Sequence, residues 1–265
     1  MARPARGPTT LVAAAVLAVA AAAWLALVLG GHGHAAGPAA PVTHDHGSMA
    51  AAAPVGIGPV LAGWALMVVA MMLPPALPLA GVLARLLARH RPGLGITAGL
   101  AAFVAVWVGV GVLLITGDAV IDSLTGPWTV DARTRLAGAL VLLAGAYQFA
   151  PVKNACLTAC RSPRWFALRF WRGRSPVRES SALSAAYAVS CVGCCWALML
   201  LGLGAGALAL PVMVVLTVLM TAERLVPGRA VTVLVRASGA VLGVVGVALL
   251  AGLVPASLVH PFLGV

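Results

Sequence analysis

The chain has 265 residues, of which 62% are hydrophobic and only 9% are charged. A soluble globular domain carries about 25% charged residues, so this composition excludes a water-soluble globule and a disordered chain alike. The 17 basic residues against 6 acidic ones give a net charge of +11. In a chain of many apolar spans, such an excess reflects membrane orientation and does not indicate a nucleic-acid partner. The composition therefore predicts an all-α, polytopic integral membrane helical bundle.

Seven long apolar stretches are candidate transmembrane helices, because one bilayer crossing needs roughly 20 apolar residues. They cover residues 9–30, 59–83, 94–116, 136–152, 182–207, 210–226 and 231–253. With the N-terminus in the cytoplasm, every basic residue except Arg133 and Arg135 falls on the inner side, as the positive-inside rule requires. We expect about seven helices in a bacterial cytoplasmic membrane with an anionic inner leaflet, the N-terminus inside and the C-terminus outside.

The segment before the second span is rich in Ala, Gly and Pro and is typical of a flexible extracytoplasmic linker. Four of the six histidines lie in it: His32, His34, His44 and His46. Short His-rich tracts commonly bind metal, and a polar linker that binds nothing is the alternative.

Four segments follow from this organisation. Residues 1–30 are a membrane anchor, which the length of the apolar run favours over a cleaved signal peptide. The others are the linker over 31–58, a membrane core over 59–226, and a C-terminal helix with a short outer tail over 227–265.

Two further patterns are interpreted as membrane packing and not as binding motifs. The inner loop over 161–178 interleaves aromatic residues with arginines, which is typical of an interfacial helix on an anionic leaflet. Gly239, Gly243 and Gly246, like the glycines over 202–206, are small residues that let apolar helices approach closely.

The fifth span carries a cluster of sulfur atoms. Residues 191–199 read Cys-Val-Gly-Cys-Cys-Trp-Ala-Leu-Met. This spacing places Cys191, either Cys194 or Cys195, and Met199 on one face of a helix. Single buried cysteines and methionines are usually packing residues, but three cysteines in five positions favour metal binding.

The second span places Met67 and Met71 one turn apart, with Met72 beside them, before a run of prolines at positions 74, 75 and 78. Proline removes backbone N–H donors, and a membrane tolerates such a break only where protein or a cavity satisfies the freed carbonyls. The sequence therefore predicts a broken helix next to these thioethers.

Near the inner face, Cys156 and Cys160 are four residues apart, so a short helix would present both thiols together. The sixth span ends with Met220 and Glu223. An acidic residue at that depth indicates a functional site, and pairing with Arg224 or an inner-loop arginine is the structural alternative. Counted along the helices, Cys191 to Cys195 lie near mid-membrane and Cys156 and Cys160 near the inner face, as successive sites on one route.

Thiolate and thioether ligands prefer Cu(I), with zinc a weaker candidate. Two thiolates on one Cu(I) leave a negative charge, which Lys153 or Arg161 could offset at the inner site. Copper is therefore the expected ligand.

These motifs resemble the DUF2182 group, a bacterial family described as predicted metal-binding integral membrane proteins. The resemblance rests on residues 64–78, 151–163 and 191–199 and on Met220 with Glu223, and it covers about residues 59–226. It implies a metal-binding membrane core without naming a reaction. Arg224 stands where the family pattern has lysine, and the His-rich segment has no counterpart in it.

The leading hypothesis is a membrane protein that binds a soft metal for transport or for delivery to a metallochaperone or metalloenzyme. Cu(I) is the first candidate for that metal. No catalytic triad, nucleotide-binding sequence or hydrolase motif is found, which argues against an enzyme. A thiol–disulfide protein that passes electrons across the membrane is one alternative, although none of the cysteines is expected on the oxidising side. A metal-binding assembly factor without transport is another.

Overall fold

The computed structural model describes residues 8–33, 57–88, 92–125, 130–203 and 209–253. Within these ranges the chain forms helices and short connections and no strand, which confirms the all-α prediction. The helices are α1 (Pro8–Gly33), α2 (Ile57–Met72), the 3-10 helix η1 (Pro74–Ala76), α3 (Leu77–Leu86), α4 (Pro92–Thr125), α5 (Val130–Tyr147), α6 (Pro151–Arg161), α7 (Pro163–Phe170), α8 (Pro176–Leu203), α9 (Ala209–Leu225) and α10 (Arg229–Leu250).

Four helices, α1, α4, α8 and α10, are each long and apolar enough to cross a membrane. Two bent pairs, α2 with η1 and α3, and α5 with α6, are each apolar enough to form a broken span or a re-entrant loop. The described helices therefore include four to six candidate membrane spans, which is typical of a membrane protein. The sixth expected span, 210–226, corresponds to α9, whose 17 residues fall short of the roughly 20 that one crossing usually takes.

Prolines decide where several of these helices begin. Pro74 and Pro75 cannot donate to the preceding turn, so α2 ends, η1 forms, and the chain bends by 54° before α3. Pro151 stands at the first position of α6 and accompanies a bend of 65° after α5. The broken second span and the short helix around Cys156 and Cys160 are thus confirmed.

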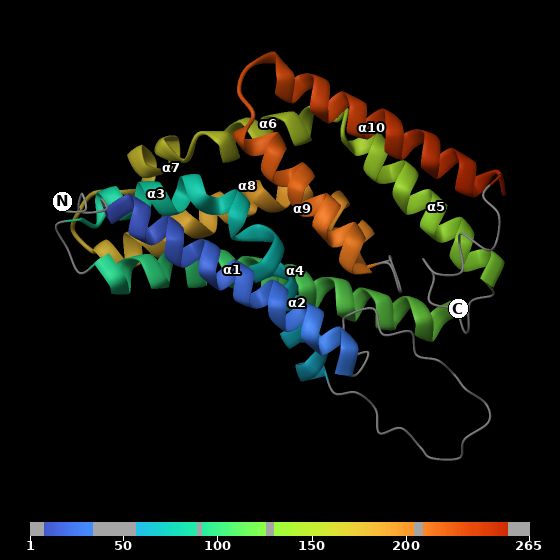
Figure 1. Cartoon of the computed structure of the whole chain (residues 1–265), viewed down its shortest axis with the longest axis horizontal. Helices are drawn as coiled ribbons and strands as arrows, with labels where there is room; N and C mark the ends of the chain where they lie inside the picture. The colour runs from blue at the N-terminus through green and yellow to red at the C-terminus, as the bar shows by residue number, and fades with distance from the viewer. Residues whose placement is uncertain (1–7, 34–56, 89–91, 126–129, 204–208, 254–265) are drawn as a thin grey trace, which may run out of the picture.

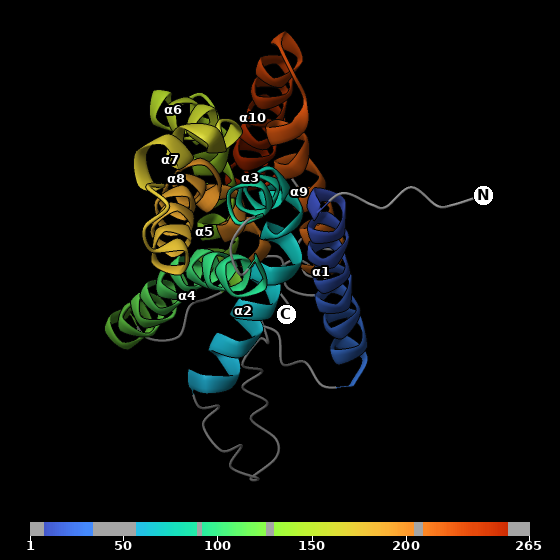
Figure 2. The ribbon, with the colours of Figure 1, turned by 90° about the vertical axis from the view of Figure 1, so that its left-hand side faces the viewer.

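α8 lies at the centre of the bundle. Half of its apolar window is buried, against 17–22% for α1, α4 and α10. It packs along α4 and also contacts α5, α6, α7 and α9. Figures 1 and 2 show α1 on the outside against α2 and α3, and α10 lying beside α5 at the other end of the molecule. The residues of α8 are therefore more enclosed by protein than those of the other three long apolar helices.

α5 and α10 approach closely because glycines line their contact. A Cβ on Gly246 would lie 2.5 Å from the backbone nitrogen of Leu142, and one on Gly145 would lie 2.6 Å from that of Gly243. The packing role expected for Gly239 and Gly246 is confirmed, since a Cβ on Gly239 would also collide with Gln148 at 2.7 Å. At Gly243 an added Cβ would meet no atom within 4 Å, so a side chain there would not collide. The glycines at 204 and 206 lie outside the described residues.

α7 has the amphipathic character expected for the inner loop. Phe166 is buried against the bundle, whereas Leu168 is 87% exposed. The guanidinium of Arg169 lies 5.7 Å from the ring centroid of Trp165, an arrangement that keeps charge and aromatic surface together. The contact of α7 with lipid remains a prediction.

Candidate functional site

Four cysteines from two helices meet inside the bundle. The Sγ atoms of Cys160 on α6 and Cys194 on α8 are 3.7 Å apart, and those of Cys194 and Cys195 are 3.2 Å apart. Cys191 lies one turn before Cys194, whose thiol donates to the Cys191 carbonyl at 3.2 Å. All four are free thiols and at most 1% exposed. We call this group the sulfur cluster.

The sulfur cluster changes the expected arrangement of sites. Counting along the helices predicts Cys160 near the inner face, apart from the mid-membrane thiols of α8. Because α6 bends away from α5 and packs on α8, Cys160 instead contacts Cys194 directly. The two expected successive sites therefore merge into one cluster at Cys160, and the spacing of residues along the chain could not reveal this.

Two tyrosines fix the backbone beside the sulfur cluster. The hydroxyl of Tyr187 donates to the Cys160 carbonyl at 2.9 Å, and that of Tyr147 donates to the Gly193 carbonyl at 2.6 Å. Tyr147 also packs edge-on against Trp196. These bonds join α6 and α5 to α8 at the level of the thiols.

Cys156 lies one turn before Cys160 on the same face of α6. A Cβ on Gly193 would lie 2.5 Å from the Cys156 Sγ, so the absence of a side chain at Gly193 is what makes room for this thiol. Cys156 is partly exposed, unlike the four thiols of the sulfur cluster. It is therefore the cysteine nearest to the surface of the bundle.

Arg224 on α9 points into the sulfur cluster. Its Nη2 donates to the sulfurs of Cys191 at 2.8 Å, Cys195 at 3.0 Å and Cys194 at 3.5 Å. The side chain is 5% exposed. The guanidinium of Arg224 therefore lies among three thiols. A metal ion bound by the same three sulfurs would need that position.

Within the described ranges, no group of three or more His, Cys, Asp or Glu side chains is arranged to hold a metal ion. With a metal–sulfur distance of about 2.3 Å, as for zinc, two sulfurs on one ion lie roughly 3.8 Å apart in tetrahedral geometry and about 4.6 Å in linear geometry. The 3.7 Å between Cys160 and Cys194 is close to the shorter value. The Cys160–Cys194 pair therefore has nearly the spacing of a two-thiolate metal site. Among the described residues, no larger set of ligands is arranged around one point.

The predicted thioethers lie in the same buried core as the sulfur cluster. These are Met67, Met71, Met72, Met199 and Met220, and Met213 joins them. Thioether sulfur is polarizable and packs in irregular gaps, and it is also a Cu(I) ligand. Their burial fits both roles.

Glu223 belongs to a separate buried network. Its carboxylate accepts from the Lys153 Nζ at 2.8 Å and from the Gln148 Nε2 at 3.3 Å, and both charged side chains are 1% exposed. Gln148 also donates to the Ser238 hydroxyl at 3.1 Å. Glu223 is therefore paired with Lys153 and not with Arg224, and neither it nor Lys153 points to the thiols.

Residues 61–249 match the family model described as PpoB2, copper chaperone. The chain belongs to the PpoB2 copper chaperone family. The match covers most of the chain and runs past residue 226, the expected end of the core, through nearly all of α10. It supports a copper-related family and says nothing of the DUF2182 name. No curated protein and no solved structure matches the chain.

The histidines of the linker are not part of the matched region, which begins at residue 61. His34, His44 and His46 lie outside the described residues, and so does the side chain of His32. Metal binding there stays a prediction for this member of the copper chaperone family.

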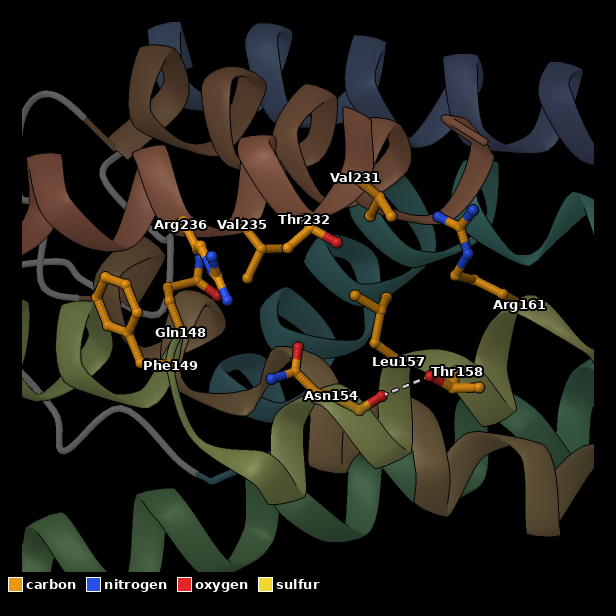
Figure 3. Close-up of a pocket in the computed structure, with 10 residues that line it drawn as sticks. All are labelled: Gln148, Phe149, Asn154, Leu157, Thr158, Arg161, Val231, Thr232, Val235 and Arg236. Carbon is orange, nitrogen blue, oxygen red and sulfur yellow. Dashed lines mark hydrogen bonds between the residues drawn. The ribbon is translucent and has the colours of Figure 1, made fainter. Parts of the chain in front are cut away.

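A polar pocket of about 410 Å³ lies on the side of α6 that faces α10. In Figure 3, Asn154 and Leu157 of α6 face Thr232 and Val235 of α10 across it. Arg161 contributes to the lining and donates to the backbone carbonyls of residues 223 and 226, both at 2.6 Å, so it holds the end of α9. α6 thus presents thiols to α8 and polar groups to this pocket.

Reasoning from the sequence missed Arg224 and the two tyrosines as neighbours of the thiols. A signal for Arg224 is present, since it continues the stripe of Met213, Thr217 and Met220 at helical spacing. The positive-inside rule accounts for its charge by orientation alone and so hides this signal. Nothing in the sequence marks the tyrosines, because their bonds depend on how α5, α6 and α8 pack.

Proposed function

We propose that this family member is a copper chaperone of the bacterial cytoplasmic membrane that binds Cu(I) at the sulfur cluster and delivers it to a metalloprotein. The observation that carries the proposal is the meeting of Cys160 with Cys191, Cys194 and Cys195 in a copper chaperone family member. Thiolates are soft ligands that favour Cu(I) over hard ions.

Methionines and a nearer-surface thiol extend the site in this proposal. The thioethers of Met67, Met71, Met72, Met199 and Met220 lie in the same buried core as the cluster, and we propose them as weaker ligands. Cys156, partly exposed and one turn from Cys160, is the exchange ligand through which copper enters or leaves. The linker histidines would collect the ion outside the membrane, and residues 59–226 would form the metal-binding core.

For Glu223 we propose a structural role, which is the alternative to metal binding. Because its carboxylate is already paired with Lys153 and Gln148, we assign it to holding α5, α6 and α9 together. A carboxylate in that state is a poor ligand for a soft ion.

The test is the copper content of protein purified in detergent and loaded anaerobically with Cu(I), measured by elemental analysis and by competition with a chromophoric Cu(I) chelator. We expect bound Cu(I) in the native chain and its loss in Cys191→Ser/Cys194→Ser. The matched control is Val189→Ala, a change on the same helix at a side chain that is 63% exposed and faces away from the thiols. Native protein without copper, or full binding by the double variant, would contradict the proposal.

A second candidate function is thiol–disulfide exchange, favoured by one observation. The Cys160 and Cys194 sulfurs are in contact, so these two thiols could be oxidised to a disulfide with small movements. Thiol trapping at graded redox potentials separates the functions. A reversible two-electron couple that is lost in Cys160→Ser, in protein that binds no metal, would favour redox exchange over copper delivery.

Delivery and transport are separated by two further measurements. Purified protein loaded with Cu(I) should pass it to an apo metalloprotein acceptor without crossing a bilayer. Copper uptake into proteoliposomes that lack any acceptor would instead indicate transport.

A further inference from the structure

Arg224 is a buried cation whose charge is only partly satisfied. Its Nη2 has three sulfur acceptors, but the Nε and Nη1 atoms are buried and have no hydrogen-bond partner in the part of the chain that the structure describes. Thiol sulfur is a weak acceptor, so neutral thiols compensate little of the cost of burying a guanidinium. When these thiols carry their protons, the site holds one positive charge without a matching negative charge.

The neighbouring acidic residue does not supply the missing charge. Glu223 precedes Arg224 in the chain, but successive helical residues point about 100° apart, and the Glu223 carboxylate is bonded to Lys153. Breaking a buried ion pair is strongly destabilising, so Glu223 is held where it is. The negative charge that Arg224 lacks must come from the cysteines themselves.

Cu(I) binding would produce that charge. When one Cu(I) ion binds two thiols, two S–H bonds break, two protons leave to solvent, and two Cu–S bonds form while copper stays Cu(I). The ion carries +1 and the two thiolates −2, so the complex carries −1. Adding the guanidinium brings the buried site to zero.

We infer that Arg224 is the counter-cation of a Cu(I) dithiolate in the sulfur cluster and sets the affinity of the site for copper. This inference rests on the proposed function. Arg224 is a positioning residue, because it acts on the thiolates and not on the metal. Its Nη2 donates to the sulfurs, so it also orients their lone pairs before the ion arrives.

The location of the guanidinium adds one requirement. Nη2 lies within 3.5 Å of all three α8 sulfurs and so occupies the space between them. Copper can enter only if Nη2 moves aside while the guanidinium stays near the thiolates.

The test compares Arg224→Gln, Arg224→Lys and the native chain in two measurements: Cu(I) affinity by chelator competition, and thermal unfolding of the metal-free protein. We expect Arg224→Gln to lower Cu(I) affinity on the order of 100-fold, because the buried complex then keeps an unbalanced charge. Arg224→Lys, which keeps the charge, should recover most of the affinity. Metal-free Arg224→Gln should be at least as stable as the native chain, because an unsatisfied buried cation has been removed.

A counter-cation and a structural arginine differ in these two measurements. Replacing a counter-cation lowers the Cu(I) affinity without lowering the stability of the metal-free protein, whereas replacing a structural arginine lowers the stability. Arg229→Gln is the matched control, since Arg229 is exposed at the start of α10 and should change neither. Native-like affinity in Arg224→Gln, or a metal-free Arg224→Gln that is unstable or unfolded, would overturn the inference. The proposed function would survive that result if Cys191→Ser/Cys194→Ser still lost copper, and would fall if the native chain bound none.

Discussion

Glu223 and Arg224 are neighbours on α9, yet their side chains end in opposite kinds of surroundings. Glu223 is bonded to the ammonium of Lys153 and the amide of Gln148, whereas Arg224 has only thiols as partners. One charge is balanced and hydrogen-bonded, and the other lacks a matching negative charge. A buried charge with a matching partner is explained by structure, whereas a buried charge without one is a candidate functional residue.

The largest expected effect comes from removing the Glu223 carboxylate, which balances the charge of Lys153. Glu223→Gln leaves the Lys153 ammonium buried without a carboxylate, and we expect a loss of about 3–5 kcal/mol in the free energy of unfolding. Chemical denaturation in detergent measures it. Copper affinity of the remaining folded protein should be unchanged, because Glu223 does not contact the thiols.

A double change sharpens the same point. Lys153→Met with Glu223→Leu removes both charges and should recover most of the lost stability, since apolar replacements of buried ion pairs are often neutral. Native stability in Glu223→Gln together with lost copper binding would show that the carboxylate acts on the metal and that the contrast drawn above is wrong.

A smaller effect is expected on the sulfur side from Gly193→Ala. The added Cβ would meet the Cys156 Sγ at 2.5 Å, so α6 or the thiol must shift, at a cost of about 1–3 kcal/mol. We expect slower copper loading, measured by stopped-flow competition. The same change at Gly109, around which no atom lies within 4 Å of an added Cβ, is the control. Equal loading rates in all three chains would remove Cys156 from the exchange route.

The smallest effect is expected far from both side chains. Replacing His32, His34, His44 and His46 by alanine should leave the thermal stability and the copper content of loaded protein unchanged, because the linker precedes the matched region. Copper acquisition by cells at limiting copper should fall. Loss of copper from the purified, fully loaded variant would instead place a main site in the linker.

Local chemistry predicted much of this fold, because prolines and small residues act over a few positions. The break at Pro74 and Pro75, the short helix carrying Cys156 and Cys160, and the close approach at Gly239 all follow from the sequence. The number of crossings was harder to predict, since α9 is short and two spans are bent.

The composition of the site was harder still to predict, because it depends on which helices touch. Cys160 reaches Cys194 only through the bend before α6, and Lys153 reaches Glu223 across 70 residues of chain. Counting depth along the chain assumes straight helices, so it separated thiols that the bend brings together. The sequence offered Arg224 or an inner-loop arginine as the partner of Glu223, and neither forms the ion pair. The pairing with Lys153 depends on how α6 and α9 pack and on the rotation of α9, which the sequence does not specify.

The closure of the sulfur cluster has a kinetic consequence. At most 1% of Cys160, Cys191, Cys194 and Cys195 is exposed, so neither a donor nor an acceptor protein can touch these atoms while the bundle is shut. If copper is bound at the sulfur cluster, its release requires a movement of the helices that exposes these sulfur atoms. The residence time of copper should be set by that opening, and its dissociation rate should stay constant as competing chelator is raised.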